Sequence, residues 1–134
     1  MKTIKKLAIS CLVLGAVFIL YVYFAGVTLI LDNRSGQPIH NVQVAYNRGI
    51  FQANSIKDTE SIKKALGKIG EGSDFHVQWQ DEAGSNLKAN FNVYFSLSFG
   101  YTTVRIKMLP RGEALLYEGG REYRPTAESI RHNA

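Results

Sequence analysis

A run of 25 residues without a charged side chain, from Leu7 to Leu31, limits the folds open to this chain. An α-helix rises about 1.5 Å per residue, so roughly 20 apolar residues cross a hydrocarbon core of about 30 Å. The run therefore predicts one membrane-spanning helix over residues 7–26. Three lysines precede it, whereas only Arg34 lies close behind it. Because cytoplasmic flanks carry the excess of Lys and Arg, we expect a bacterial inner-membrane protein with a cytoplasmic N-terminus and a periplasmic C-terminal domain.

The flanks of the run complete this interpretation. Residues 1–6 form a basic cytoplasmic flank, and two tyrosines fall where an aromatic belt would meet the far interface. The residues assigned to the ends of the anchor are Lys2, Lys5, Lys6, Tyr21 and Tyr23. The chain has a net charge of +5, but from Asp32 onward thirteen Lys and Arg face eleven Asp and Glu, an excess of only +2. Since nucleic-acid-binding proteins usually carry a larger basic excess, we expect no nucleic-acid partner.

Two other interpretations of the N-terminus share these features. A cleaved signal peptide ends in small residues at alternate positions, but the bulky Tyr23 and Phe24 occupy the relevant positions here. A lipoprotein would use Cys11, yet Ala8 stands where the lipid-attachment motif usually has leucine. We therefore interpret Cys11 as an ordinary helix residue. It is the only cysteine, so the chain forms no intrachain disulfide.

The remainder of the sequence has the period-two pattern of β-strands. After Gly26, the β-branched residues of Val27–Asp32 predict a first strand almost at once. The clearest alternation covers Asp74–Gln80 and, after a turn, Leu87–Phe95. These two segments predict an antiparallel hairpin with one buried face, on which Trp79 is the central core aromatic.

Further short strands complete a β-domain over residues 27–118. Asp58–Leu66 interrupts the pattern, with features of one or two helical turns or of an irregular strand. The other predicted strands are Ile39–Tyr46, Ile50–Ala53, Thr102–Met108 and Ala114–Tyr117. Six or seven short strands separated by turn residues predict a mainly β fold, a small antiparallel immunoglobulin-like sandwich. The polar residues 119–134 are interpreted as a flexible tail.

The sequence contains no recognisable catalytic constellation. The three histidines, His40, His76 and His132, show neither metal-ligand spacing nor a carboxylate close in sequence that would pair with them. His40 and His76 can share an exposed sheet face, but two separate surface histidines are the simpler interpretation. Asp81 and Glu82 are adjacent in a predicted turn and meet solvent. We therefore expect a non-enzymatic protein without a metal or cofactor.

A partner surface is predicted from exposed aromatic and basic residues near the second half of the domain. Tyr94 lies on the polar phase of its strand, and two more rings follow in a turn. The predicted surface comprises Tyr94, Phe99, Tyr101, Lys88, Arg105 and Lys107. The alternative is that these rings pack over the open end of the sandwich. Edge strands of such a sandwich can also pair with a strand of a partner.

The arrangement of the chain resembles small uncharacterised bacterial envelope proteins. The resemblance rests on the lysine-led anchor, on the motif Asn33-x-Ser35-Gly36-Gln37-Pro38 between two strands, and on Asp81-x-x-Gly84 after a later strand. It covers most of the chain, and it implies a non-enzymatic envelope domain without assigning functional residues. We therefore expect the periplasmic sandwich to bind another envelope protein, in an accessory or structural role. The alternative is an anchored immunity protein that neutralises an envelope-targeted toxin.

Overall fold

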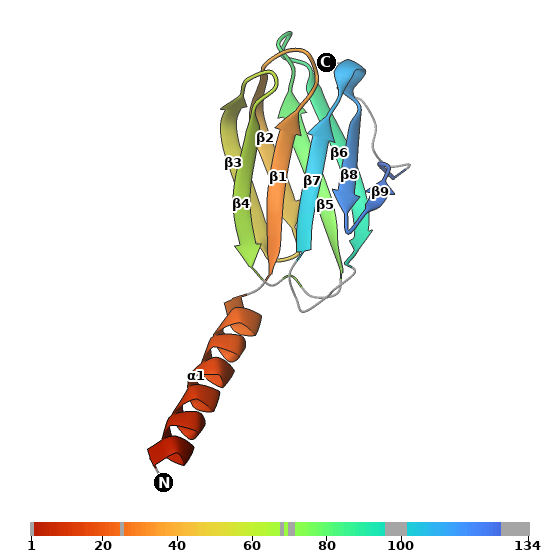
Figure 1. Cartoon of the computed structure of the whole chain (residues 1–134). Helices are drawn as coiled ribbons and strands as arrows, with labels where there is room; N and C mark the ends of the chain where they lie inside the picture. The colour runs from red at the N-terminus through yellow and green to blue at the C-terminus, as the bar shows by residue number, and fades with distance from the viewer. Residues whose placement is uncertain (1, 25, 68, 70–71, 96–101, 127–134) are drawn as a thin grey trace.

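A computed structural model describes residues 2–24, 26–67, 69, 72–95 and 102–126 of the chain (Figure 1). The elements within these residues are helix α1 (Lys2–Phe24), strands β1 (Val27–Asn33), β2 (Ile39–Tyr46), β3 (Gly49–Ile56), β4 (Ser61–Gly67), β5 (Gly72–Gln80), β6 (Asn86–Tyr94), β7 (Thr102–Met108), β8 (Ala114–Glu118) and β9 (Arg121–Tyr123), and a short 3-10 helix, η1 (Pro110–Gly112). The fold is thus mainly β with one N-terminal apolar helix, as the sequence predicted.

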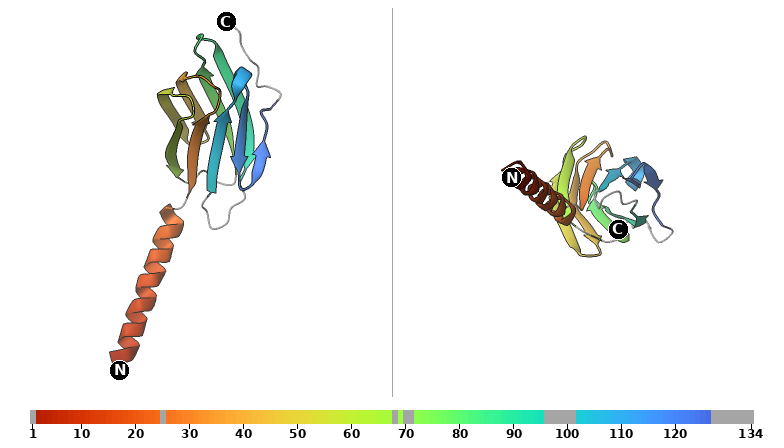
Figure 2. Two further views of the ribbon diagram at one scale, coloured as in Figure 1. Left: turned by 45° about the horizontal axis from the view of Figure 1, so that its top comes forward. Right: turned by 60° about the horizontal axis from the view of Figure 1, so that its bottom comes forward.

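Helix α1 projects away from the strands, at the end of the domain where β1 begins (Figures 1 and 2). Its segment Thr3–Leu20 is long and apolar enough to cross a membrane, and none of it is buried against the domain. The helix is therefore not a core element, and it has the length and composition of a membrane span or signal anchor. It covers Lys2–Phe24, whereas the sequence predicted a helix over residues 7–26, and β1 starts at Val27 as predicted.

The strands form two sheets that face each other around one core (Figure 1). Sheet A has the order β4-β1-β7-β8-β9, and sheet B has the order β3-β2-β5-β6. The predicted hairpin is β5 and β6, in which Phe75 lies opposite Phe91 and Trp79 opposite Leu87. Trp79 is 2% exposed, which confirms it as a core residue.

One pairing differs from the expected antiparallel arrangement. Strands β1 and β7 are parallel neighbours along their whole length, from Val27 opposite Thr102 to Asn33 opposite Met108. The chain between them passes through both sheets, so no tight hairpin forces an antiparallel pair. The prediction of a wholly antiparallel domain was therefore wrong at the centre of sheet A.

Two segments are strands that the sequence left open or missed. The helical alternative for Asp58–Leu66 was wrong, because β4 pairs antiparallel with β1 there and its backbone groups gain hydrogen bonds in the ladder. Within the predicted tail, β9 pairs with β8. Gly119 and Gly120 both have positive φ, and this backbone conformation allows the tight turn between the two strands.

The junction between α1 and β1 depends on a close backbone approach at Gly26. A Cβ atom on Gly26 would lie 2.4 Å from both the carbonyl carbon and the carbonyl oxygen of Gly67. We expect Gly26→Ala to lower the free energy of unfolding by about 1–3 kcal/mol, because β1 and β4 must separate to admit the methyl group. Urea denaturation of the full chain in detergent, followed by Trp79 fluorescence, measures this loss. Gly15→Ala is the matched control, since nothing lies within 4 Å of its added Cβ, and an equal loss in both variants would contradict the prediction.

Candidate functional site

The outer face of sheet A gathers basic side chains from two strands, β4 and β7, and from the turn after β1. Alternation along β1 and β7 turns Asp32, Arg105 and Lys107 outward, away from the core. We call this surface the basic face, and its residues are Asp32, Arg34, Lys63, Arg105, Lys107, Tyr117 and Glu122. Four cations against two carboxylates give this face a net charge of +2.

A buried carboxylate holds the basic face together. Asp32 is 1% exposed, and its Oδ1 atom accepts hydrogen bonds from Arg34 Nε at 2.9 Å and from Ser61 Oγ at 3.0 Å. Its Oδ2 atom lies 3.6 Å from Arg105 Nη1 and accepts no hydrogen bond within the described part of the chain. Both arginine side chains remain about half exposed. Asp32 therefore holds Arg34 by a hydrogen bond and attracts Arg105 by charge alone, while the outer surfaces of both guanidinium groups stay accessible to a partner.

The opposite side of the basic face is ordered by an aromatic ring. Lys107 Nζ lies 5.1 Å from the ring centroid of Tyr117, within the range of a cation–π contact. The Tyr117 hydroxyl donates to Glu122 Oε1 at 3.0 Å. This hydrogen bond and the nearby negative charge raise the pKa of Tyr117 above its ordinary value. Because Glu122 belongs to β9, a strand that the sequence did not predict contributes to the surface.

The structure divides the predicted partner surface between two sheets. Arg105 and Lys107 lie on the basic face, whereas Lys88 and Tyr94 lie on the outer side of β6 in sheet B. Tyr94 is 63% exposed, in agreement with its polar phase. The outer sides of the two sheets point in opposite directions, so these four residues do not form one surface. The remaining two predicted residues, Phe99 and Tyr101, lie outside the described residues.

Sequence reasoning missed Asp32, Arg34 and Tyr117. The period-two spacing of Leu29 and Leu31 in the core indicates that Asp32 points outward. It does not indicate that Ser61 and Arg105 lie beside it, because those residues come from neighbouring strands distant in sequence. Of the predicted anchor residues, Lys2, Lys5, Lys6, Tyr21 and Tyr23 all belong to α1.

The histidines within the described residues have separate environments. His76 Nδ1 lies 2.8 Å from Asn90 Oδ1 on the outer side of sheet B. His40 Nε2 lies 3.5 Å from Glu82 Oε2, while Asp81 Oδ1 accepts from the backbone of Ser85 in the same turn. Over the described ranges, no group of three or more His, Cys, Asp or Glu is placed to hold a metal ion. His132 lies outside those ranges.

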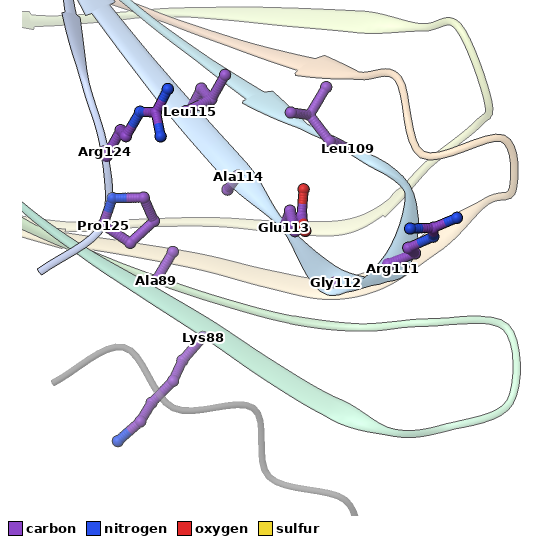
Figure 3. Close-up of a pocket in the computed structure, with 10 residues that line it drawn as sticks. All are labelled: Lys88, Ala89, Leu109, Arg111, Gly112, Glu113, Ala114, Leu115, Arg124 and Pro125. Carbon is purple, nitrogen blue, oxygen red and sulfur yellow. The ribbon is translucent and has the colours of Figure 1, made fainter. Parts of the chain in front are cut away.

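A cavity of about 510 Å³ opens between β6 and β8 (Figure 3). Lys88 and Arg124 both line it, but their side chains point to different sides of the opening, so they form no convergent site (Figure 3). The chain after β9 closes one end, where Thr126 N donates to the Asn90 carbonyl and the Tyr123 hydroxyl donates to the Tyr94 carbonyl. The free edge of β6 is therefore partly occupied by the chain itself, and the basic face is the stronger candidate for a protein-binding site.

Comparison with known proteins does not place the chain in a family. No protein-family model matches it, and no curated protein is a significant match. Among solved structures, the chain is similar to an NMR structure of a protein from Eubacterium rectale. The two share 17% sequence identity with a TM-score of 0.46, and the match covers 71% of this chain and 89% of that one.

Proposed function

We propose that this protein is a single-pass bacterial inner-membrane protein whose periplasmic domain, an immunoglobulin-like sandwich, binds another envelope protein through the basic face. The apolar helix and the three lysines near its N-terminal end support the anchored topology. The short connection between α1 and β1 supports a domain held close to the membrane, because only Ala25 and Gly26 separate the two elements. Both outer sheet faces then point sideways from the helix, where a neighbouring envelope protein can reach them (Figure 1).

The observation that carries this proposal is the buried Asp32 carboxylate beneath half-exposed arginines. An isolated surface ion pair contributes about 0–1 kcal/mol, so stability alone gives little reason to bury a carboxylate at such a surface. The hydrogen bond to Asp32 does restrict Arg34 before any partner arrives, which lowers the entropy lost on binding, and the same carboxylate attracts Arg105 to the adjacent position. A face with a net charge of +2 is complementary to an acidic surface. An envelope-targeted toxin is one class of protein partner that this proposal includes.

Charge reversal on the basic face is expected to abolish partner binding. We expect Arg105→Glu combined with Lys107→Glu to reduce the yield of a crosslinked partner by at least about tenfold, because close like charges at an interface cost several kcal/mol. The yield is measured in native membranes from a photo-crosslinking residue placed at Thr103, which precedes these positions on the outward side of β7.

Lys88→Glu is the control on sheet B, since it makes one charge reversal of the same kind there and should leave the yield unchanged. Unaltered crosslinking in the double variant would contradict the use of the basic face. A separate reporter fused to the C-terminus tests the topology by protease accessibility. A cytoplasmic reporter would overturn the periplasmic assignment, whatever the crosslinking shows.

A further inference from the structure

The outer face of sheet B has a chemistry unlike that of the basic face. Nine of the thirteen Asn and Gln residues of the chain lie on it. We call this surface the amide face, and its carboxamides are Asn41, Gln43, Gln52, Asn54, Gln78, Gln80, Asn86, Asn90 and Asn92. The outward positions of the described strands of sheet A carry no carboxamide. The two sheets therefore present one charged surface and one nearly uncharged, hydrogen-bonding surface.

Strand formation alone does not explain why so many carboxamide side chains lie on the amide face. Asparagine is unfavourable in β-strands, where β-branched residues are preferred at exposed positions. Asn41 has a local reason, because its φ of +50° lies in the left-handed region at a bulge between β2 and β5. Asn54 and Asn92 are exposed within regular strands, and among the described residues neither side chain makes a hydrogen bond that stabilises the sheet. Strand propensity therefore does not account for the asparagines of this face.

The carboxamides are held in a fixed pattern across three strands. Asn41 Nδ2 donates to Gln80 Oε1 at 2.7 Å, and Gln80 Nε2 donates to Asn86 Oδ1 at 2.9 Å. This chain of hydrogen bonds runs from β2 through β5 to β6. Within the described residues it leaves the Asn41 carbonyl oxygen free to accept and the Asn86 amino group free to donate. Beside this chain of hydrogen bonds, Gln43 of β2 lies opposite Gln78 of β5.

These side chains surround a hollow of about 550 Å³ in the face of the sheet. The residues that line it are Asn41, Gln43, Gln78, Trp79, Gln80, Asn86, Leu87 and Lys88. Small-ligand sites commonly measure about 300–1,000 Å³, so a ligand of a few rings fits this volume. The lining contains one cation and no carboxylate. Trp79 and Leu87 are almost fully buried, so they offer little apolar surface to a ligand.

The chemistry of the lining selects the class of ligand. A carboxamide donates and accepts hydrogen bonds without a charge, and a hydroxyl group does the same. A multiply charged ligand would find only Lys88 as a charged partner, and an apolar ligand would leave the amides desolvated and unpaired. A peptide strand usually pairs with a sheet edge or inserts side chains into apolar pockets, and this hollow is neither. We infer that the amide face binds a neutral, hydroxyl-rich ligand, namely an oligosaccharide.

The inference is tested by titrating the ¹⁵N-labelled full chain in nanodiscs of neutral lipid. One arm uses a hexamer of N-acetylglucosamine and the other uses a hexamer of glucose, which separates an amino-sugar glycan from other neutral glycans. We expect at least one sugar to shift the side-chain NH₂ resonances of Gln43, Gln78, Gln80 and Asn86. Binding in either arm supports the inference and identifies the sugar class.

Substitutions distinguish this site from non-specific contact. Gln43→Ala combined with Gln78→Ala is expected to weaken binding by at least about tenfold, because two pairs of donors and acceptors are lost. Gln52→Ala is the matched control: it lies opposite Gln43 on β3 but outside the hollow, and its affinity should change less than about twofold. Gln78→Glu keeps the shape of the side chain and should also weaken binding. This variant tests the site if the double variant loses its native backbone spectrum.

Three results would overturn the inference. The first is that neither sugar shifts the four resonances up to its solubility limit, and the second is that the substituted chain binds as tightly as the unsubstituted chain. An uncharged peptide that shifts these resonances when the sugars do not would assign the face to polypeptides instead. Since the basic face lies on the other sheet, failure here leaves the proposed protein interaction intact, and the Arg105→Glu and Lys107→Glu variant should still bind the sugar.

Discussion

Replacing Asn33 with alanine is expected to lower the free energy of unfolding by about 3–5 kcal/mol, because buried polar groups lose their partners. Asn33 is fully buried, and the two hydrogens of its Nδ2 group are shared among three carbonyl oxygens at 2.8–3.1 Å. These carbonyls belong to Gln37, Ile56 and Lys57. Its Oδ1 atom accepts from both the backbone and the hydroxyl of Ser35. One side chain thus joins the end of β1 to the following turn and to the end of β3.

The size of the effect follows from the carbonyl oxygens that lose their hydrogen-bond donor when alanine replaces Asn33. Each buried polar group left unsatisfied costs about 1–3 kcal/mol, and water that enters to replace Asn33 offsets part of the sum. Asn33→Asp is expected to lose at least as much, because it keeps the shape but places a carboxylate against three carbonyl oxygens. Both losses are measured by urea denaturation of the full chain in detergent. The matched control, Asn92→Ala, removes an exposed carboxamide and should stay within about 0.5 kcal/mol.

Losses of equal size in Asn33→Ala and Asn92→Ala would show that the buried network contributes no more than an exposed amide. The network also explains the motif Asn33-x-Ser35-Gly36, on which the resemblance to bacterial envelope proteins rested. Gly36 has a φ of +87° in this turn, and its amide donates to Asp58 Oδ1. The motif is therefore a structural device that fixes a turn and two strand ends.

The parts of the fold that sequence reasoning found are those with a local signal. Side chains in a strand alternate between two faces, so Phe75, Val77 and Trp79 reveal the inward side of β5 without knowledge of its neighbours. The end of α1 is likewise local, because the apolar run passes through Gly26 into β-branched residues. These elements were predicted to within a few residues.

The parts that it missed depend on partners far away in sequence. The parallel pairing of β1 with β7 joins residues about 75 positions apart, and no pattern within either strand encodes the direction of its neighbour. Strand β4 has irregular burial because it is an edge, so its own alternation was weak. The basic face was missed because it also depends on distant partners. Asp32 contacts Ser61 and Arg105 only after β1 has paired with β4 and with β7. The partner surface predicted from exposed residues in the second half of the chain therefore combined residues that lie on the outer faces of two different sheets.

Replacing Phe75 with alanine is the second large expected effect, a loss of about 3–5 kcal/mol from the cavity left in the core. Phe75 is fully buried in β5, an inner strand of sheet B. Its ring centroid lies 6.3 Å from that of Phe95 in an edge-to-face arrangement and 6.4 Å from that of Tyr46. Such aromatic pairs contribute about 0.5–1.5 kcal/mol beyond the area that they bury.

Two further variants separate the contributions at this position. Phe75→Leu keeps most of the apolar volume but loses the ring contacts, so its loss should be about 1–2 kcal/mol. Tyr94→Ala removes an aromatic side chain that is 63% exposed at the end of β6, and its loss should stay near 0.5 kcal/mol. The losses should therefore increase in the order Tyr94→Ala, Phe75→Leu, Phe75→Ala. A Phe75→Ala loss no larger than that of Tyr94→Ala would mean that the two sheets do not share the packed core that holds both outer faces in place.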